Sequence, residues 1–391
     1  MINKNALAIW ASTGLLVMLC GAWVLPSNKL YHQLMIFLLW VPALLALIHR
    51  DFRLMLKGPE CMLFALFAAW TIAVVMVEGG DNTLSKVKVT LYVVLTLTGV
   101  LLAAQNRLWR LESMLLYASI LGGFFAAVSW IYFYGISVQP WRGRVIAIGL
   151  WNTPIMAAHA VGALAILGIF TLQTRRFKPL IMALLLVPVL GYALFLGFNQ
   201  TRGVWIALGV CLLVMGGARP SRLGGVLIFL VILGVVGVAA LRPELLLQRG
   251  VSYRPQLWQG GLQLMLDHRV MGVGFTEYQI FIPELGRAFK HPHNLFLDTG
   301  VRLGVPGLLL FGCLWLAAGW RGWVCRAQPL GQALLALWAF SSTSLLTDGI
   351  GLWLKPNADW LVTWLPIALS FVLAARGSAA PQEPVLQNGT T

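Results

Sequence analysis

The sequence predicts an all-α polytopic membrane protein with about twelve transmembrane helices and one large outer loop that contains an amphipathic helix. Hydrophobic residues make up 59% of the 391 residues and charged residues only 10%. A soluble domain has about 25% charged residues, so one soluble core could not bury this much apolar surface. The composition also excludes a secreted disulfide scaffold, a coiled coil and a disordered chain.

Long apolar segments follow one another along the chain, and in lipid each must form its own backbone hydrogen bonds as a helix. They lie near residues 6–26, 30–48, 61–77, 89–104, 113–134, 150–172, 179–198, 203–217, 223–241, 300–319, 330–347 and 360–375. Their even number places both termini on one side, and short basic loops, such as those with Arg50, Arg107 and Arg175, identify that side as cytoplasmic.

The chain divides accordingly into four parts. We expect helices 1–9 in residues 1–241, the outer loop in 242–293, helices 10–12 in 294–376, and a disordered cytoplasmic tail in 377–391. The five cysteines all lie in apolar stretches without a C-x-x-C pair, so they are interpreted as fillers of the core or the lipid face.

The outer face is unusually basic. The chain has 28 Lys and Arg against 13 Asp and Glu, a net charge of +15, and Arg142, Arg144 and Arg202 fall in short outer connections where the positive-inside rule disfavours them. Two interpretations stay open: side chains that reach lipid headgroups, or an anion site of convergent guanidinium groups. Membrane lipids are therefore expected partners, whereas the lack of basic runs excludes nucleic acid.

The outer loop has a helical part and an irregular part. Leu257, Gly261, Leu262, Met265 and Leu266 recur at near-helical spacing and predict an amphipathic helix over residues 254–268 on the outer surface. Residues 275–290, with Pro283 and Gly286, are expected to be irregular.

Polar residues gather where this loop re-enters the membrane. Arg287, Lys290, His291 and His293 precede Asn294, which is suited to cap the following apolar helix. A neutral histidine can take a proton from a hydroxyl at working pH. The two histidines lack further ligands at metal-binding spacing, and no P-loop, Rossmann, zincin or serine-hydrolase motif is present, so neither metal nor cofactor is expected.

Three more ionisable residues have plain interpretations. Asp298 and Arg302 are four residues apart on the predicted helix, which favours a mutual ion pair over a catalytic role for Asp298. His159 lies inside the sixth span and is expected to be a neutral, hydrogen-bonded histidine.

Three pieces of the sequence, in this order, carry a family resemblance. They are QTRGVW (200–205), YRPQLWQGGLQLMLDHRVMGVGFTEY (253–278) and HPHNLFLDTGVRLGVPGLLLF (291–311). Together they resemble the S-R-G-x-W, R-x-x-x-W…G-x-G and H-N-x-x-L…G-x-P-G elements of the bacterial O-antigen ligase and Wzy-type polymerase superfamily. The chain departs from the family at Gln200-Thr201, which replace a serine, and at residues 267–269, where a His-Pro pair is usual.

The resemblance implies roles for individual residues. Arg202 and Arg254 match the arginines that hold the diphosphate of the substrate, and His293 matches the essential histidine. Weaker substrate-binding candidates are Arg142, Arg144, Arg287, Lys290, His291 and Asn294.

The activity implied is glycosyl transfer at the periplasmic face of the bacterial inner membrane, without a metal and with inversion at the anomeric carbon. The donor would be an undecaprenyl diphosphate-linked glycan, and for a ligase the acceptor would be lipid A–core. The overall length, the basic outer face and the single dominant loop favour the ligase over a Wzy-type polymerase. A lipid-linked oligosaccharide flippase, the rival from another class, should show two related halves and deep charges.

Overall fold

The computed structural model describes residues 3–78, 83–151, 153–172, 177–220, 253–349 and 351–378, together with residues 225 and 229. Within these residues, ten helical segments are long and apolar enough to cross a membrane. Eight of them are α1 (Lys4–Val24), α5 (Pro59–Glu78), α6 (Thr83–Ala103), α8 (Pro154–Leu172), α9 (Pro179–Asn199), α14 (Leu295–Val324), α15 (Pro329–Thr347) and α16 (Trp360–Ser378). This architecture confirms the predicted all-α polytopic membrane protein.

The other two segments contain π-helical turns. In one, α2 (Asn28–Met35) continues through Ile36–Trp40 into α3 (Val41–Ala46), and in the other α7 (Leu111–Ile131) continues into Tyr132–Ile136. A short helix, α4 (Arg50–Met55), follows the first of these segments.

Two of the twelve predicted spans are not among these ten. The eighth corresponds to α10 (Arg202–Ala218), an apolar helix of 17 residues that is shorter than the others. Most of the ninth, predicted over residues 223–241, lies outside the described residues, as do the start of the predicted outer loop (242–252) and most of the predicted tail (379–391).

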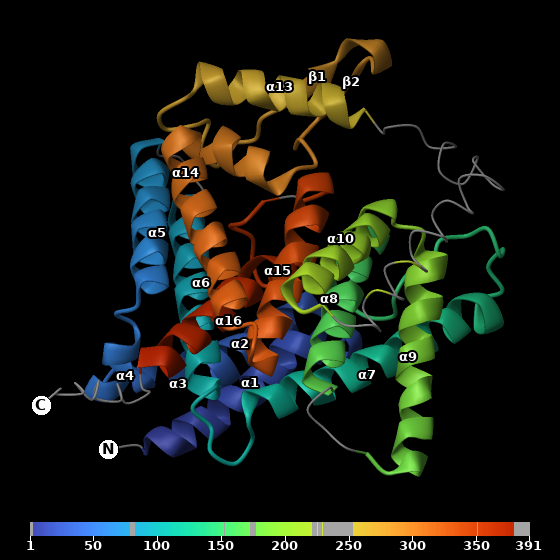
Figure 1. Cartoon of the computed structure of the whole chain (residues 1–391). Helices are drawn as coiled ribbons and strands as arrows, with labels where there is room; N and C mark the ends of the chain where they lie inside the picture. Colours follow the sequence, from blue (N-terminus) through green and yellow to red (C-terminus); the bar gives the residue numbers. More distant parts are fainter. Residues whose placement is uncertain are drawn as a thin grey trace, which may run out of the picture.

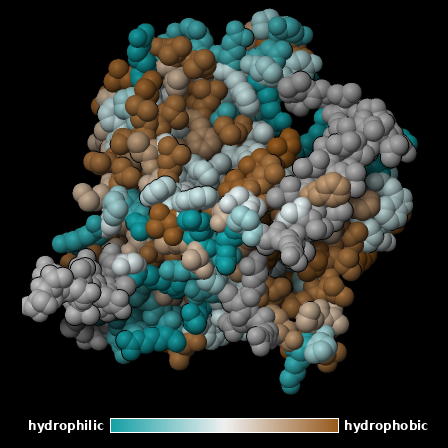
Figure 2. Space-filling model, in the orientation of Figure 1, coloured by the Kyte–Doolittle hydropathy of each residue, from teal (hydrophilic) through white to brown (hydrophobic). Residues whose placement is uncertain are grey.

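The two ends of the molecule differ in structure (Figure 1). One end carries both termini, and the other carries α13 (Arg254–Asp267) with a small hairpin of β1 (Ile280–Ile282) and β2 (Arg287–Phe289). Figure 2 shows hydrophobic surface over much of the helix flanks and hydrophilic surface towards the two ends. This distribution is what a bilayer around the helices requires.

Ion pairs at the end with the termini bind distant helices together. Arg321 Nε lies 2.7 Å from Glu60 Oε1, and Arg376 Nη1 lies 2.6 Å from Glu112 Oε1. Two acidic residues of the predicted cytoplasmic side, Glu60 and Glu112, are therefore paired with arginines.

Helix α13 lies on α14 through a narrow apolar stripe. Its buried residues are Leu257, Gly261 and Met265, and the Sδ of Met265 fits where a side chain on Gly300 would come within 2.4 Å. The predicted helix is confirmed, but Leu262 and Leu266 are 46% and 44% exposed, because the stripe that packs against protein has four-residue spacing and leaves these two leucines beside it.

The expectation of irregular structure over residues 275–290 was wrong in part. Ile280–Ile282 pairs antiparallel with Arg287–Phe289, and a turn over Pro283–Leu285 ends at Gly286 with a φ of +57°. Ile280 and Ile282 are buried while Phe281 is exposed. This alternation is typical of a strand with one buried face, but the run is too short to be distinctive in the sequence.

Helix α14 bends at Gly304, where φ is +68°. A side chain there would lie 2.1 Å from the carbonyl oxygen of Val270. The backbone groups released by the bend find other partners: Val305 N–H donates to Arg269 O at 2.8 Å, and Trp70 Nε1 donates to Leu303 O at 2.9 Å. The bend lets the first turns of α14 run beneath α13 (Figure 1), so the start of α14 is held at the end opposite the termini.

Candidate active site

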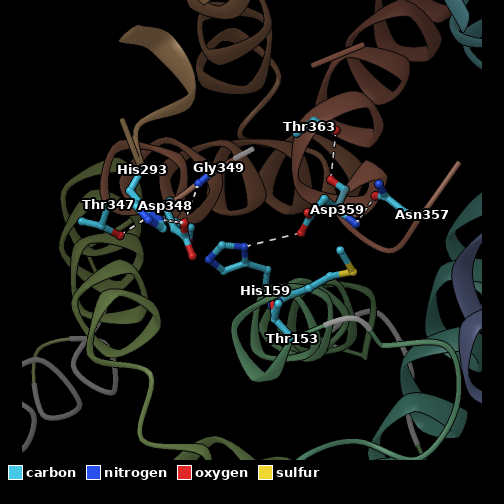
Figure 3. Close-up of polar contacts among 11 residues, drawn as sticks. Thr153, His159, His293, Thr347, Asp348, Gly349, Asn357, Asp359 and Thr363 are labelled. Carbon is cyan, nitrogen blue, oxygen red and sulfur yellow. Dashed lines mark hydrogen bonds and ion pairs between the residues drawn. The ribbon is translucent and has the colours of Figure 1, made fainter. Parts of the chain in front are cut away.

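His293 and Asp348 form a direct contact between the ends of two helices. His293 Nδ1 lies 2.9 Å from Asp348 Oδ1 (Figure 3). His293 precedes the N-cap of α14, and Asp348 directly follows α15. The fold therefore joins two polar residues that are 55 positions apart in the sequence.

The backbone around His293 is closely specified. His293 has a φ of +51°, a left-handed conformation that histidine adopts more readily than most side chains. The next residue, Asn294, begins the helix, since its side chain accepts a hydrogen bond from Leu297 N at 3.1 Å. The predicted cap is thus confirmed, and it fixes the position of His293 relative to α14.

The environment of Asp348 keeps its side chain ionised. Burial alone would raise the pKa of this carboxyl, but the hydrogen bond from His293, the nearby charges of His159 and His293, and the backbone N–H of Gly349 lower it to about 2. Gly349 N donates to Asp348 Oδ1 at 2.9 Å. Asp348 is therefore a carboxylate at neutral pH and can only accept hydrogen bonds.

The tautomer of His293 follows from this charge. A carboxylate has no hydrogen to give, so Nδ1 of His293 must carry the hydrogen of the 2.9 Å contact. When the ring is neutral, its Nε2 then has the free lone pair. The arrangement suits His293 to take a proton and Asp348 to stabilise the resulting imidazolium.

Three arginines meet at a cavity of about 200 Å³ on one side of this pair. The cavity is lined by Arg144, Arg202 and Arg254 together with Asp348, and His159 and Thr201 also face it. Arg144 comes from the connection between α7 and α8, Arg202 is the first residue of α10, and Arg254 is the first of α13. The fold thus gathers guanidinium groups that are far apart in the sequence.

The turn between α9 and α10 is held by Asn199, which is fully buried. Its side-chain nitrogen donates to Val145 O at 2.8 Å and Pro154 O at 3.0 Å, and its oxygen accepts from the Thr201 hydroxyl. Arg144 also binds this turn, because it donates to Asn199 O at 3.0 Å and to Thr201 Oγ1 at 2.9 Å. These bonds fix the start of α10 and therefore the position of Arg202, its first residue.

Gly203 permits the close approach of α10 and α15. A Cβ at this position would lie 2.5 Å from Thr347 Oγ1, a distance at which the Thr347 side chain or one of the two helices must shift. The glycine of the R-G pair thus allows the close packing that brings Arg202 and Asp348 to one cavity.

A second histidine and a second carboxylate lie behind Asp348. Figure 3 shows His159 of α8 between Asp348 and Asp359, with its Nδ1 3.7 Å from Asp359 Oδ1. A cavity of about 20 Å³ lies among these three residues, which is room for about one water molecule. His159 is buried, as a histidine within a span should be, but its contact with Asp359 is too long for a direct hydrogen bond.

His291 faces the other side of His293. The centroids of the two rings are 4.1 Å apart. Burial lowers the pKa of His291 to about 4. The charges of His293 and Arg302 also lower this pKa, whereas the charge of Asp348 raises it. This histidine is therefore neutral at working pH and adds no charge beside His293.

Three other predicted residues lie away from the arginine cavity. Arg142 and Arg287 are exposed, and Lys290 forms an exposed pair with Glu277 at 3.0 Å. The predicted ion pair of Asp298 and Arg302 is confirmed at 3.1 Å. Asp298 is buried and also accepts a hydrogen bond from the Tyr278 hydroxyl, so its interactions are those of a structural residue.

The ligands needed for a metal do not gather in the part of the chain that the structure describes. No group of three or more His, Cys, Asp and Glu side chains there is placed to hold an ion. The cationic groups at the arginine cavity instead suit a polyanion.

Sequence reasoning missed Asp348. The residue follows a span in the segment LLTDGIGLW, where a lone carboxylate at the end of an apolar helix was a detectable signal. Nothing near it in the sequence indicates a partnership with His293, which depends on the packing of α14 against α15.

Comparison with known proteins shows which proteins this chain is similar to. Residues 189–312 match the family model described as O-antigen ligase, a region that contains Arg202, Arg254 and His293. Over 367 residues, which are 92% of this chain and 89% of the relative, the chain is 27% identical to an O-antigen ligase of Pseudomonas aeruginosa. The chain is therefore similar to O-antigen ligases over most of its length. Asp348 lies outside the segment matched by the family model, although it completes the pair with His293.

Proposed function

We propose that the protein is an O-antigen ligase that transfers a glycan from undecaprenyl diphosphate to a sugar hydroxyl of lipid A–core. The observation that carries the proposal is the His293–Asp348 pair beside a cavity lined by three arginines. A base for the acceptor and a cationic site for a diphosphate are the two groups that this reaction needs.

The arginines act on the leaving group. As the bond from the anomeric carbon to the diphosphate oxygen breaks, negative charge grows on the diphosphate. Arg202 and Arg254 can stabilise it through bidentate hydrogen bonds without a metal. Arg144 is held by Asn199 and Thr201, so its charge is fixed at the cavity and needs no reorganisation during the reaction.

His293 acts on the acceptor. Its Nε2 takes the proton of the sugar hydroxyl while the hydroxyl oxygen bonds to the anomeric carbon, and undecaprenyl diphosphate leaves with the electron pair of the broken bond. Asp348 stabilises the imidazolium. A single displacement of this kind inverts the configuration of the anomeric carbon, and a well-placed base contributes roughly 10²–10⁴ in rate.

The site is proposed to face the periplasm from the bacterial inner membrane, with both termini in the cytoplasm. The arginine cavity is formed where α10 and α13 begin and α15 ends, opposite the end that carries the termini (Figure 1). The basic short loops of the terminal end support its assignment to the cytoplasm.

The identity of the product tests the proposal. Purified full-length protein is given undecaprenyl diphosphate-linked glycan, lipid A–core and a chelator. Glycan on lipid A–core would support a metal-independent ligase. Longer glycan chains on the lipid carrier, with none on lipid A–core, would instead indicate a Wzy-type polymerase. Activity that requires added metal would contradict the proposed mechanism.

The arginines are tested by donor binding. We expect Arg202→Gln and Arg254→Gln each to weaken donor binding by roughly 10–150-fold, the effect of losing hydrogen bonds to a charged group. Arg219→Gln is the matched control, because Arg219 is an exposed arginine at the opposite end of α10. Equal effects at Arg202 and Arg219 would contradict a specific diphosphate site.

A further inference from the structure

A second, larger cavity is lined by His291, the neighbour of His293. Its volume is about 400 Å³. The residues that define its chemistry are Lys86, Tyr278, Lys290, His291, Arg302 and Trp353.

Each of the two cavities is lined by a residue that contacts His293. Asp348, the partner of His293, lines the arginine cavity. His291, whose ring is 4.1 Å from that of His293, lines the second cavity. His293 therefore contacts one residue of each cavity. In an inverting displacement the base lies beside the acceptor, on the face of the anomeric carbon opposite the leaving group.

Cationic and aromatic groups line the second cavity together. Lys86 Nζ lies 5.2 Å from the ring centroid of Phe275, which also lines it. Arg302 is neutralised by Asp298, and Lys290 pairs with Glu277 at the exposed rim. Lys86 is therefore the cation best placed to receive an anion from outside the protein.

The aromatic residues suit a sugar. Tyr278 and Trp353 lie in the wall, and aromatic side chains offer an apolar face with a polar edge. The buried indole N–H of Trp353 and Nδ1 of His291 have no hydrogen-bond partner among the described residues. Neutral His291 can exchange hydrogen bonds with hydroxyl groups without repelling the adjacent imidazolium.

We propose that this cavity binds the acceptor, an anionic saccharide whose phosphate or carboxylate is held by Lys86 while its hydroxyl is presented to His293. The assignment rests on the proposed function and adds to it where the acceptor binds and by which chemistry. It also explains why the two cavities differ: arginines surround the diphosphate of the donor, whereas lysine and aromatic groups surround a sugar.

The test compares two lysines of one helix. Lys86 lines the cavity, whereas Lys88 is exposed and does not. Binding of labelled lipid A–core to full-length protein in detergent is measured for wild type, Lys86→Gln, Lys86→Arg and Lys88→Gln, and again after the probe's accessible phosphate groups are removed by phosphatase. Donor binding is measured in parallel.

We expect Lys86→Gln to bind the phosphorylated probe about ten-fold more weakly, the effect of one charge-assisted hydrogen bond. Lys86→Arg and Lys88→Gln should stay near wild type, and the dephosphorylated probe should not distinguish the four proteins. Unchanged donor binding by Lys86→Gln would show that its loss of acceptor binding is not a failure to fold.

Two results would overturn the assignment. One is unchanged binding of the phosphorylated probe by Lys86→Gln, and the other is weakened donor binding with acceptor binding intact, which would assign the cavity to the donor glycan. A wild type that binds the probe through Lys86 but transfers no glycan to it would contradict the proposed function and leave this assignment standing.

Discussion

Replacement of Asp348 by asparagine would remove the charge of the side chain while its hydrogen bonds can remain. Oδ1 of Asp348 accepts from both His293 Nδ1 and Gly349 N, each at 2.9 Å. The amide oxygen of asparagine can occupy the same place, so both hydrogen bonds can persist. The charge that stabilises a protonated His293 is lost.

The size of the effect follows from these contacts. A hydrogen bond to a charged group contributes about 1.5–3 kcal/mol and a neutral one about 1 kcal/mol, and the charge matters more once the imidazolium has formed. The difference of about 0.5–2 kcal/mol predicts a kcat lower by roughly 2- to 30-fold for Asp348→Asn. Asp348→Ala, which removes the bonds as well, should approach the loss of roughly 10²–10⁴ expected without the base.

The assay is the initial rate of glycan transfer to lipid A–core across pH. Because Asp348 has a pKa of about 2, its own titration leaves the profile above pH 4 unaffected. Asp267→Asn is the control, because Asp267 is an exposed carboxylate of α13 that bonds to Gln263.

A double-mutant cycle decides whether Asp348 acts through His293. In a His293→Ala background, Asp348→Asn should cause no further loss of the residual rate. If the two losses multiplied, the two residues would act independently and the reasoning would be refuted.

Three further predictions concern the support of the site. Gly203→Ala should lower transfer activity, because its Cβ would lie 2.5 Å from Thr347 Oγ1, and added Thr347→Ala should restore part of it; no recovery would contradict the proposed clash. Asn294→Ala should lower the free energy of unfolding by about 1 kcal/mol through loss of the helix cap, and Asn294→Ser should not. The pKa of His291 is lowered to about 4 in the folded protein from about 6.5 when unfolded. The unfolded chain therefore binds this proton more tightly, and the folded protein loses stability as the pH is lowered from 6.5 to 4. Over this range the midpoint temperature of thermal unfolding should fall less steeply in His291→Gln than in wild type. Equal slopes would exclude His291 as the cause.

Features that depend on residues close together in the sequence were predictable. Spans need only length and apolarity, so ten of the predicted segments correspond to long apolar helices. The helix of residues 254–267, the Asn294 cap and the Asp298–Arg302 pair follow from spacing within a few residues. The short hairpin was missed because three-residue strands carry too little pattern.

Features that depend on tertiary contacts were not predictable from the sequence. Asp348 meets His293 only because α14 and α15 pack together, and Arg144 reaches the site through the buried Asn199 turn. The resemblance singled out individual residues but gave no distances between them. Convergence of Arg202 and Arg254 at one cavity is a property of the fold.

We propose that His293 is the base at a diphosphate site that other residues form. It is tested most directly by measuring kcat and donor binding separately for His293→Gln in full-length protein. We expect kcat to be lower by a factor of roughly 10²–10⁴. Donor binding should be unchanged, since the diphosphate is held by Arg202 and Arg254. Undiminished kcat, or a loss explained entirely by weaker donor binding, would contradict it.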